Sequence, residues 1–183
     1  MHKLHIRPPP DDGPAWIHLR TFRFERMGDS ARITAGCPGG DAAIFHQVVA
    51  CLAEPYLLLY VLHTPRGEQR AGRYESGELS AAEFAAFLMR FAGYLGGDSR
   101  FDLWVHAPEE DATIVWDRHD LVHAYGPLER VAGILGSLGF NEGEVDVPVP
   151  HIHHYRQEFD ADAADLLASR TWSWGPLRPE DEQ

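Results

Sequence analysis

SAAEFAAFLMRFAGYLGG, residues 80–97, is the strongest structural signal in this sequence. Ser80 and Glu83 have the spacing of a capping box, in which two side chains satisfy backbone N–H groups at the start of a helix. Apolar residues then recur every three or four positions, as on one face of a helix, and Gly96 and Gly97 are typical of a helix end. We therefore predict a helix whose buried face consists of Phe84, Phe87, Leu88, Phe91 and Leu95.

Three other segments carry related helical signals. Asp41 is a favoured N-cap, and the helical pattern after it must stop before Pro55. Pro127 suits the first turn of another helix, which ends near Gly139. Residues 161–169 give a fourth, weaker pattern.

Strand-like segments lie between these helices. The polar residues 117–120 separate two short segments rich in β-branched and aromatic residues, which is the pattern of a hairpin. Residues 56–63 are apolar on both faces, as expected of a central strand. The main expected strands are residues 16–24, 56–63, 101–106, 113–116 and 121–125.

The order of these elements predicts the fold class. Consecutive strands joined by short turns favour antiparallel pairing, and the helices between them need a sheet face to pack against. We expect an α+β fold with two layers, a mostly antiparallel sheet and helices packed on one face. A length of 183 residues fits a single domain over 1–183, with loose ends at about 1–13 and 176–183.

Composition and charge limit the function classes. The chain has 16 basic and 28 acidic residues and a net charge of −12, which argues against nucleic acid or a membrane as the partner. The longest apolar run, Tyr56 to Leu62, is far shorter than the roughly 20 residues of a membrane-spanning helix. The two cysteines, Cys37 and Cys51, lack the spacing of a metal-binding pair and favour reduced thiols in a cytoplasmic protein.

The segment PVPHIHHYRQE, residues 148–158, holds the best candidates for metal binding. Side chains two positions apart share a face of an extended chain, so His151 and His153 can offer two imidazole nitrogens to one ion. A further ligand would come from Glu158, His106, His119 or His123. The alternatives are histidines that only pack and hydrogen-bond after the prolines, or a pH-sensing or partner-binding role. A purely structural role is favoured because no third ligand is evident, so we expect no cofactor, with a divalent metal as the alternative.

The spacing His151-x-His153-x4-Glu158 resembles the first metal motif of the cupins. The resemblance covers residues 151–158 only. A cupin takes another histidine ligand from a later strand, but no histidine follows His154 in this chain. We therefore do not assign the chain to that family.

A second candidate site lies on the expected strands around the hairpin. Exposed tryptophans on a sheet face favour a protein partner or a dimer interface. The candidate surface consists of Trp104, His106, Trp116 and His123. Alternatively, the C-terminal segment with Trp172 and Trp174 covers this face within the same chain.

Two function classes remain from the sequence. No serine or cysteine has the setting of a catalytic nucleophile, so catalytic residues are not assigned and enzymatic activity is left open. The favoured class is a small, acidic, non-catalytic interaction module that binds another protein or forms a homodimer. The alternative is a metal-binding protein or a small metal-dependent enzyme that uses His151 and His153. Three ligand groups within reach of one point would favour the alternative.

Overall fold

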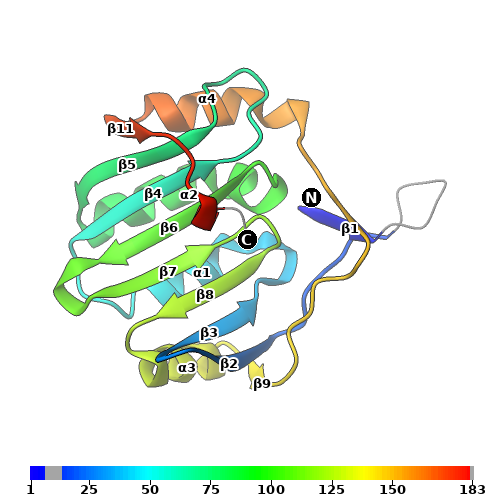
Figure 1. Cartoon of the computed structure of the whole chain (residues 1–183), viewed down its shortest axis with the longest axis vertical. Helices are drawn as coiled ribbons and strands as arrows, with labels where there is room; N and C mark the ends of the chain where they lie inside the picture. Colours follow the sequence, from blue (N-terminus) through cyan, green and yellow to red (C-terminus); the bar gives the residue numbers. More distant parts are fainter. Residues whose placement is uncertain (7–13, 182–183) are drawn as a thin grey trace.

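A nine-stranded β-sheet forms the centre of the computed structural model, which describes residues 1–6 and 14–181 (Figure 1). Its strands follow the order β11-β5-β4-β6-β7-β8-β3-β2-β9. Neighbouring strands are antiparallel except β2 and β9, which pair in parallel. The strand bounds are β2 Thr21–Met27, β3 Ser30–Gly36, β4 Tyr56–Leu62, β5 Gly72–Leu79, β6 Phe101–Ala107, β7 Ala112–Trp116, β8 Leu121–Tyr125, β9 Asn141–Glu142 and β11 Trp172–Gly175.

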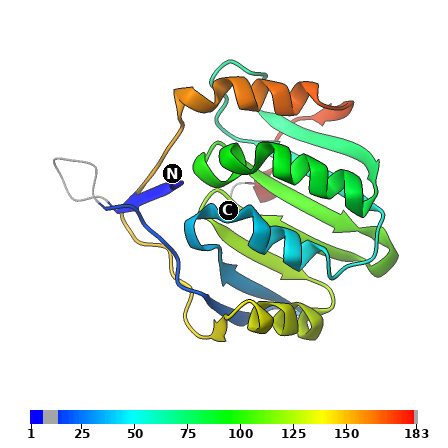
Figure 2. The ribbon, with the colours of Figure 1, turned by 180° about the vertical axis from the view of Figure 1, so that it is seen from behind.

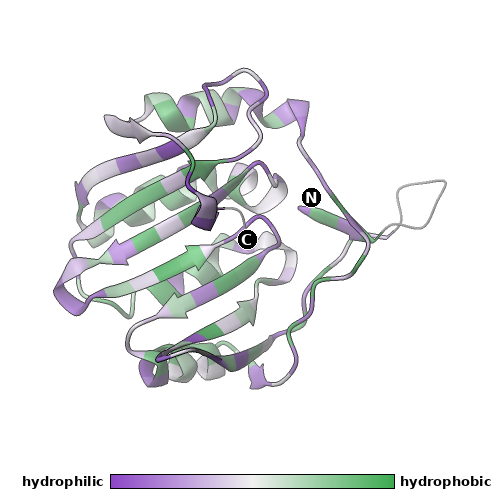
Figure 3. Ribbon diagram, viewed as in Figure 1, coloured by the Kyte–Doolittle hydropathy of each residue, from purple (hydrophilic) through white to green (hydrophobic). Residues whose placement is uncertain are grey.

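Helices cover one face of this sheet (Figure 2). They are α1 Ala42–Val49, α2 Ala81–Gly97, α3 Leu128–Ser137 and α4 Asp160–Ala168. The chain also forms short 3-10 turns at η1 Pro38–Gly40, η2 Pro108–Glu110, η3 Gln157–Phe159 and η4 Pro179–Asp181. In Figure 3, which views the sheet from the opposite side, polar and apolar residues are interspersed along the strands. The structure confirms the predicted α+β class with a mostly antiparallel sheet. Among the described helices, none has the length and apolar character needed to cross a membrane.

Helix α2 follows its sequence signals closely. Ser80 is the N-cap, and both halves of the capping box with Glu83 are formed. The predicted apolar face lies in the core: Phe84, Phe87, Leu88, Phe91 and Leu95 are all at most 4% exposed. The helix therefore supplies much of the layer that packs on the sheet.

Helices α1 and α2 approach each other through glycine. Asp41 is the N-cap of α1, as predicted, and its side chain accepts a hydrogen bond from the Ala43 N–H. Just before it, Gly40 has a φ of +64°, and a Cβ atom at this position would lie 2.2 Å from the carbonyl oxygen of Gly96. A larger residue at either position would force the two helices apart.

A two-stranded antiparallel ribbon lies beside the main sheet. Strand β1, Leu4–Ile6, pairs with β10, His151–His153, so two segments far apart in the sequence lie side by side (Figure 1). The predicted loose ends are therefore ordered in part. Residues 4–6 form a strand of this ribbon, and Asp181 of η4 is buried. Residues 7–13 and 182–183 of those expected ends lie outside the described residues.

Lys3, next to the ribbon, is fully buried under the hairpin of β7 and β8. Its Nζ atom donates to the carbonyl oxygen of Asp117 at 3.0 Å and lies 3.3 Å from a carboxylate oxygen of Asp120. The same atom sits 4.4 Å from the centre of the Trp116 ring. These contacts attach the first residues of the chain to the sheet.

The hairpin around residues 117–120 is confirmed by the pairing of β7 with β8, but the strand predicted at 16–24 is displaced. The ladder begins at Thr21 and continues to Met27. The Trp16 N–H instead donates to the carbonyl oxygen of Leu4, and the Trp16 indole N–H points to His18 Nδ1 at 3.4 Å. Trp16 therefore lies beside the ribbon through its backbone, whereas Phe22 and Phe24 of the predicted segment do form part of β2.

Candidate metal centre

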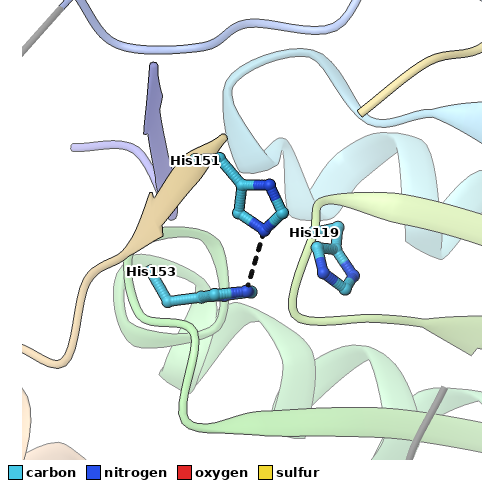
Figure 4. A group of neighbouring side chains, drawn as sticks. All are labelled: His119, His151 and His153. Atoms are coloured by element: carbon cyan, nitrogen blue, oxygen red, sulfur yellow. Dashed lines mark hydrogen bonds between the residues drawn. The ribbon is translucent and has the colours of Figure 1, made fainter. Parts of the chain in front are cut away.

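Three histidines from two separate elements converge beside the ribbon (Figure 4). His119 lies in the turn between β7 and β8, whereas His151 and His153 lie on β10. One ring nitrogen from each of the three can be chosen so that all lie within 4.8 Å of one another. All three side chains are half-buried. Among the described residues, this is the one group of three or more possible metal ligands whose ligand atoms lie this close together.

The spacing of the two β10 histidines suits a shared ion. The Nε2 atoms of His151 and His153 are 3.1 Å apart. Two imidazole nitrogens bound to zinc at about 2.0–2.1 Å in tetrahedral geometry lie roughly 3.3 Å apart. The two rings are therefore already near the separation that coordination requires.

Neighbouring oxygen atoms fix the proton on two of the rings. His151 Nδ1 lies 2.7 Å from the carbonyl oxygen of Pro148, and His119 Nδ1 lies 3.1 Å from a carboxylate oxygen of Asp117. Because a carbonyl and an ionised carboxylate only accept, both Nδ1 atoms carry the proton in the neutral ring. The Nε2 atoms of His119 and His151 then present lone pairs, as metal ligands must.

His153 is held in the neutral form that binds metals. Burial lowers its pKa, and the nearby rings of His119 and His151 lower it further, to about 3. The ring stacks parallel to Tyr155, with 6.3 Å between the ring centres. Because His151 Nε2 carries no proton, the hydrogen bond between the two Nε2 atoms runs from His153 to His151. The His153 proton must therefore shift to Nδ1 before its Nε2 atom can bind an ion.

The hairpin turn that presents His119 is braced from both sides. Asp117 Oδ1 accepts hydrogen bonds from the backbone N–H groups of His119 and Leu121, each at 2.8 Å. His18 Nε2 lies 2.7 Å from the His119 carbonyl oxygen and donates to it. Such bracing reduces the freedom that the His119 ring would lose on binding an ion.

The structure brings together two of the predicted ligands and replaces the third. Glu158 is exposed on η3 and is not part of the three-histidine group, because the chain turns into η3 after β10 instead of continuing as a strand. His106 pairs with Thr113 on the open sheet face. The third histidine of the group, His119, was one of the four further ligands considered from the sequence. It lies 32 positions before His151, and the fold brings it next to β10.

The candidate interaction surface divides between the two sheet faces. Trp104 and His106 lie half-buried on the face opposite the helices, beside a cavity of about 210 Å³. His123 lies on the same face but is only 8% exposed. Trp116 is fully buried against Lys3 and Phe45, so it lies outside any such surface.

The C-terminal segment covers the open sheet face in a different way from the one expected, in which Trp172 and Trp174 lie over it. Trp172 and Trp174 belong to the edge strand β11 and do not cross the open face. The segment after them does: Asp181 of η4 pairs with Arg73 and helps to line a small hollow next to Trp104. The C-terminal segment therefore covers part of the face through η4.

Chemically, the three-histidine group offers neutral nitrogen donors that suit zinc, copper, iron or nickel ions. Three imidazoles leave at least one coordination position for water or another ligand. The sequence signal was strongest for His151 and His153, whereas His119 was one of four candidates for a further ligand. Comparison of the chain with protein-family models, curated proteins and solved structures found no match.

Proposed function

We propose that this protein binds a divalent transition-metal ion, with zinc as the first candidate, through His119, His151 and His153. The observation that carries the proposal is the convergence of three ring nitrogens within 4.8 Å of one another. The His153 ring is neutral. The His119 and His151 rings hold their proton on Nδ1, which leaves the Nε2 atom of each as a possible ligand. Imidazole nitrogens are ligands that suit zinc, copper, iron and nickel.

The ligand number indicates what kind of centre this is. Structural zinc sites are closed by four protein ligands, whereas catalytic sites use three and keep a position for water. Zinc in such a site lowers the pKa of its bound water to about 7 and supplies a hydroxide nucleophile. The three-histidine set therefore supports the small metal-dependent enzyme among the alternatives considered above.

Metal content of untagged protein, purified without a nickel column, tests the proposal. We expect close to one equivalent of zinc after dialysis against excess ion, measured by mass spectrometry, and tight binding in calorimetry. His119→Ala, His151→Ala and His153→Ala should each reduce the bound metal severely. His106→Ala is the matched control, because it removes a half-buried histidine of the open face that bonds to Thr113 instead.

Cobalt substitution gives the coordination number. Intense visible absorption bands would indicate four-coordinate cobalt, with the fourth ligand a water that anions displace. Wild-type protein that takes up no metal, or takes up the same amount after His151→Ala, would overturn the proposed function.

A second candidate function is association through the open sheet face, with another protein or as a homodimer. The observation in its favour is the indole N–H of Trp104, which is buried without a hydrogen-bond partner among the described residues. The cavity beside it is lined largely by apolar side chains, among them Leu57 and Leu59. A partner that supplies an acceptor to this N–H would satisfy it.

Light scattering tests the homodimer form of this second proposal. The mass should be that of a dimer at neutral pH and should fall towards the monomer in Trp104→Ala. A monomer at neutral pH would rule out self-association.

A further inference from the structure

Asp117 touches the three-histidine group without belonging to it. Its Oδ2 atom lies 3.1 Å from His119 Nδ1 and 3.5 Å from His123 Nε2. Its Oδ1 atom is occupied by the two backbone N–H groups that shape the hairpin turn. The two oxygens of one carboxylate therefore serve two different purposes, one for the backbone and one for the imidazoles.

The far side of His123 shows which way its hydrogen bonds run. His123 Nδ1 lies 3.1 Å from the hydroxyl of Thr34, and that hydroxyl donates to Glu25 Oε2 at 2.8 Å. Glu25 is also held by Arg32 at 2.6 Å and is ionised, so it can only accept. The single hydroxyl hydrogen of Thr34 is thus used, and Thr34 must accept from His123.

His123 consequently carries a proton on Nδ1, the atom that donates to Thr34. Its Nε2 atom is directed at Asp117 from 3.5 Å. Asp117 Oδ2 thus lies between two imidazoles, whereas Oδ1 accepts from the backbone of its own turn. The side chain is fixed at Oδ1 and presents Oδ2 to His119 Nδ1.

We infer that Asp117 is the positioning residue of the proposed metal centre, because its Oδ2 atom keeps the His119 proton on Nδ1 and leaves Nε2 as the ligand atom. The inference rests on the proposed function and adds to it a residue that never contacts the ion. A carboxylate in this position also orients the ring and strengthens it as a ligand, and its loss typically reduces metal affinity about 10–100-fold.

Asp117→Asn separates the two purposes of the side chain. The amide oxygen can take the place of Oδ1 and keep the hydrogen bonds to the N–H groups of His119 and Leu121. The amide NH₂ then faces His119 Nδ1 and can only donate to it. His119 must move its proton to Nε2, which is the position that the ion needs.

The matched control is Asp102→Asn. Asp102 is a buried carboxylate on the same sheet face, and it also binds one backbone N–H, that of Arg118, and one imidazole, that of His63, each at 2.8 Å. Its hydrogen bonds among the described residues do not involve His119, His151 or His153. A general effect of losing a buried carboxylate would appear in both variants.

Two measurements test the inference. Long-range proton–nitrogen correlation spectra of metal-free protein should show His119 protonated on Nδ1 in the wild type and on Nε2 in Asp117→Asn. Calorimetry with zinc chloride should show affinity reduced about 10–100-fold in Asp117→Asn and changed less than twofold in Asp102→Asn, with both variants folded by circular dichroism.

The outcomes separate the inference from the function on which it rests. If wild-type protein binds no zinc, the proposed function fails and the positioning role fails with it. If wild-type protein binds zinc and Asp117→Asn binds it equally well, only the inference is overturned. If Asp117→Asn does not fold, the wild-type spectrum decides alone, and a His119 proton on Nε2 would overturn the positioning role.

Discussion

For several histidines of the open face and the ribbon, the hydrogen-bond partner of the ring decides which ring nitrogen carries the proton. His63 and His119 both face a carboxylate, whereas His106 faces a threonine hydroxyl. His151 faces a backbone carbonyl, which leaves its Nε2 atom free to coordinate. A count of histidines in the sequence therefore says little about function until each ring's neighbours are known.

Glu25 gives a prediction at the scale of one residue. Burial alone would raise its pKa, but hydrogen bonds from Arg32, Thr34 and Arg23 lower it to about 2, against an ordinary value of 4.5. Because the unfolded chain binds the proton more tightly, Glu25 stabilises the fold fully above about pH 4.5, and this contribution is lost as the pH falls towards 2.

Glu25→Gln should therefore flatten the acid dependence of stability. Urea unfolding between pH 6 and pH 3 should show a smaller loss of unfolding free energy in this variant than in the wild type. Glu129→Gln, which removes an exposed carboxylate of α3, should behave like the wild type. Equal losses in all three proteins would show that the Glu25 network does not contribute to folding stability.

The site was predictable from the sequence only in part. His151 and His153 stand two positions apart in an extended segment, so local geometry is enough to place them on one face. The turn that carries His119 was also predicted, but its approach to β10 depends on how the ribbon packs against the sheet. No pattern within a few residues encodes that contact.

At the scale of elements, the segments with the longest sequence patterns were predicted most accurately. Helix α2 has a capping box, a periodic apolar face and a terminal glycine pair, all of which act within the helix. Strands β1 and β9 have three and two residues and pair with partners over 100 positions away. Such short strands exist because of the tertiary structure and leave no periodic pattern of their own.

Phe87 tests the packing of α2. Its ring is 4% exposed and packs against Phe91, with 5.3 Å between the ring centres. Phe87→Ala should lower the free energy of unfolding by about 3–5 kcal/mol, the usual cost of a cavity left by a buried phenylalanine. Met89→Ala on the same helix is the control, because Met89 is 79% exposed. A melting temperature within a degree or two of the wild type for Phe87→Ala would contradict this assignment of the buried face.

At the scale of the whole molecule, the proposed ion would join two sheets. Two of its ligands lie on β10 of the ribbon and one on the hairpin of the nine-stranded sheet. Moving β10 away from the hairpin would thus require loss of the ion. The polar network of Lys3 already links the same two parts of the chain.

Zinc should consequently stabilise the folded protein. A ligand present at 100 times its dissociation constant adds about 2.7 kcal/mol to the free energy of unfolding when it binds only the folded state. Urea titrations with and without zinc should show this increase, and a chelator should reverse it. His151→Ala should show no increase, and an equal increase in this variant would mean that zinc binds elsewhere.

The burial of Lys3 has a practical consequence. It is the only lysine in the sequence, since the other 15 basic side chains are arginines, and the folded protein encloses its amine completely. Reagents that acylate primary amines therefore find no lysine side chain to modify until the ribbon and hairpin separate. The fraction of Lys3 acylated in a brief pulse of such a reagent would therefore measure how often the first residues of the chain come away from the sheet.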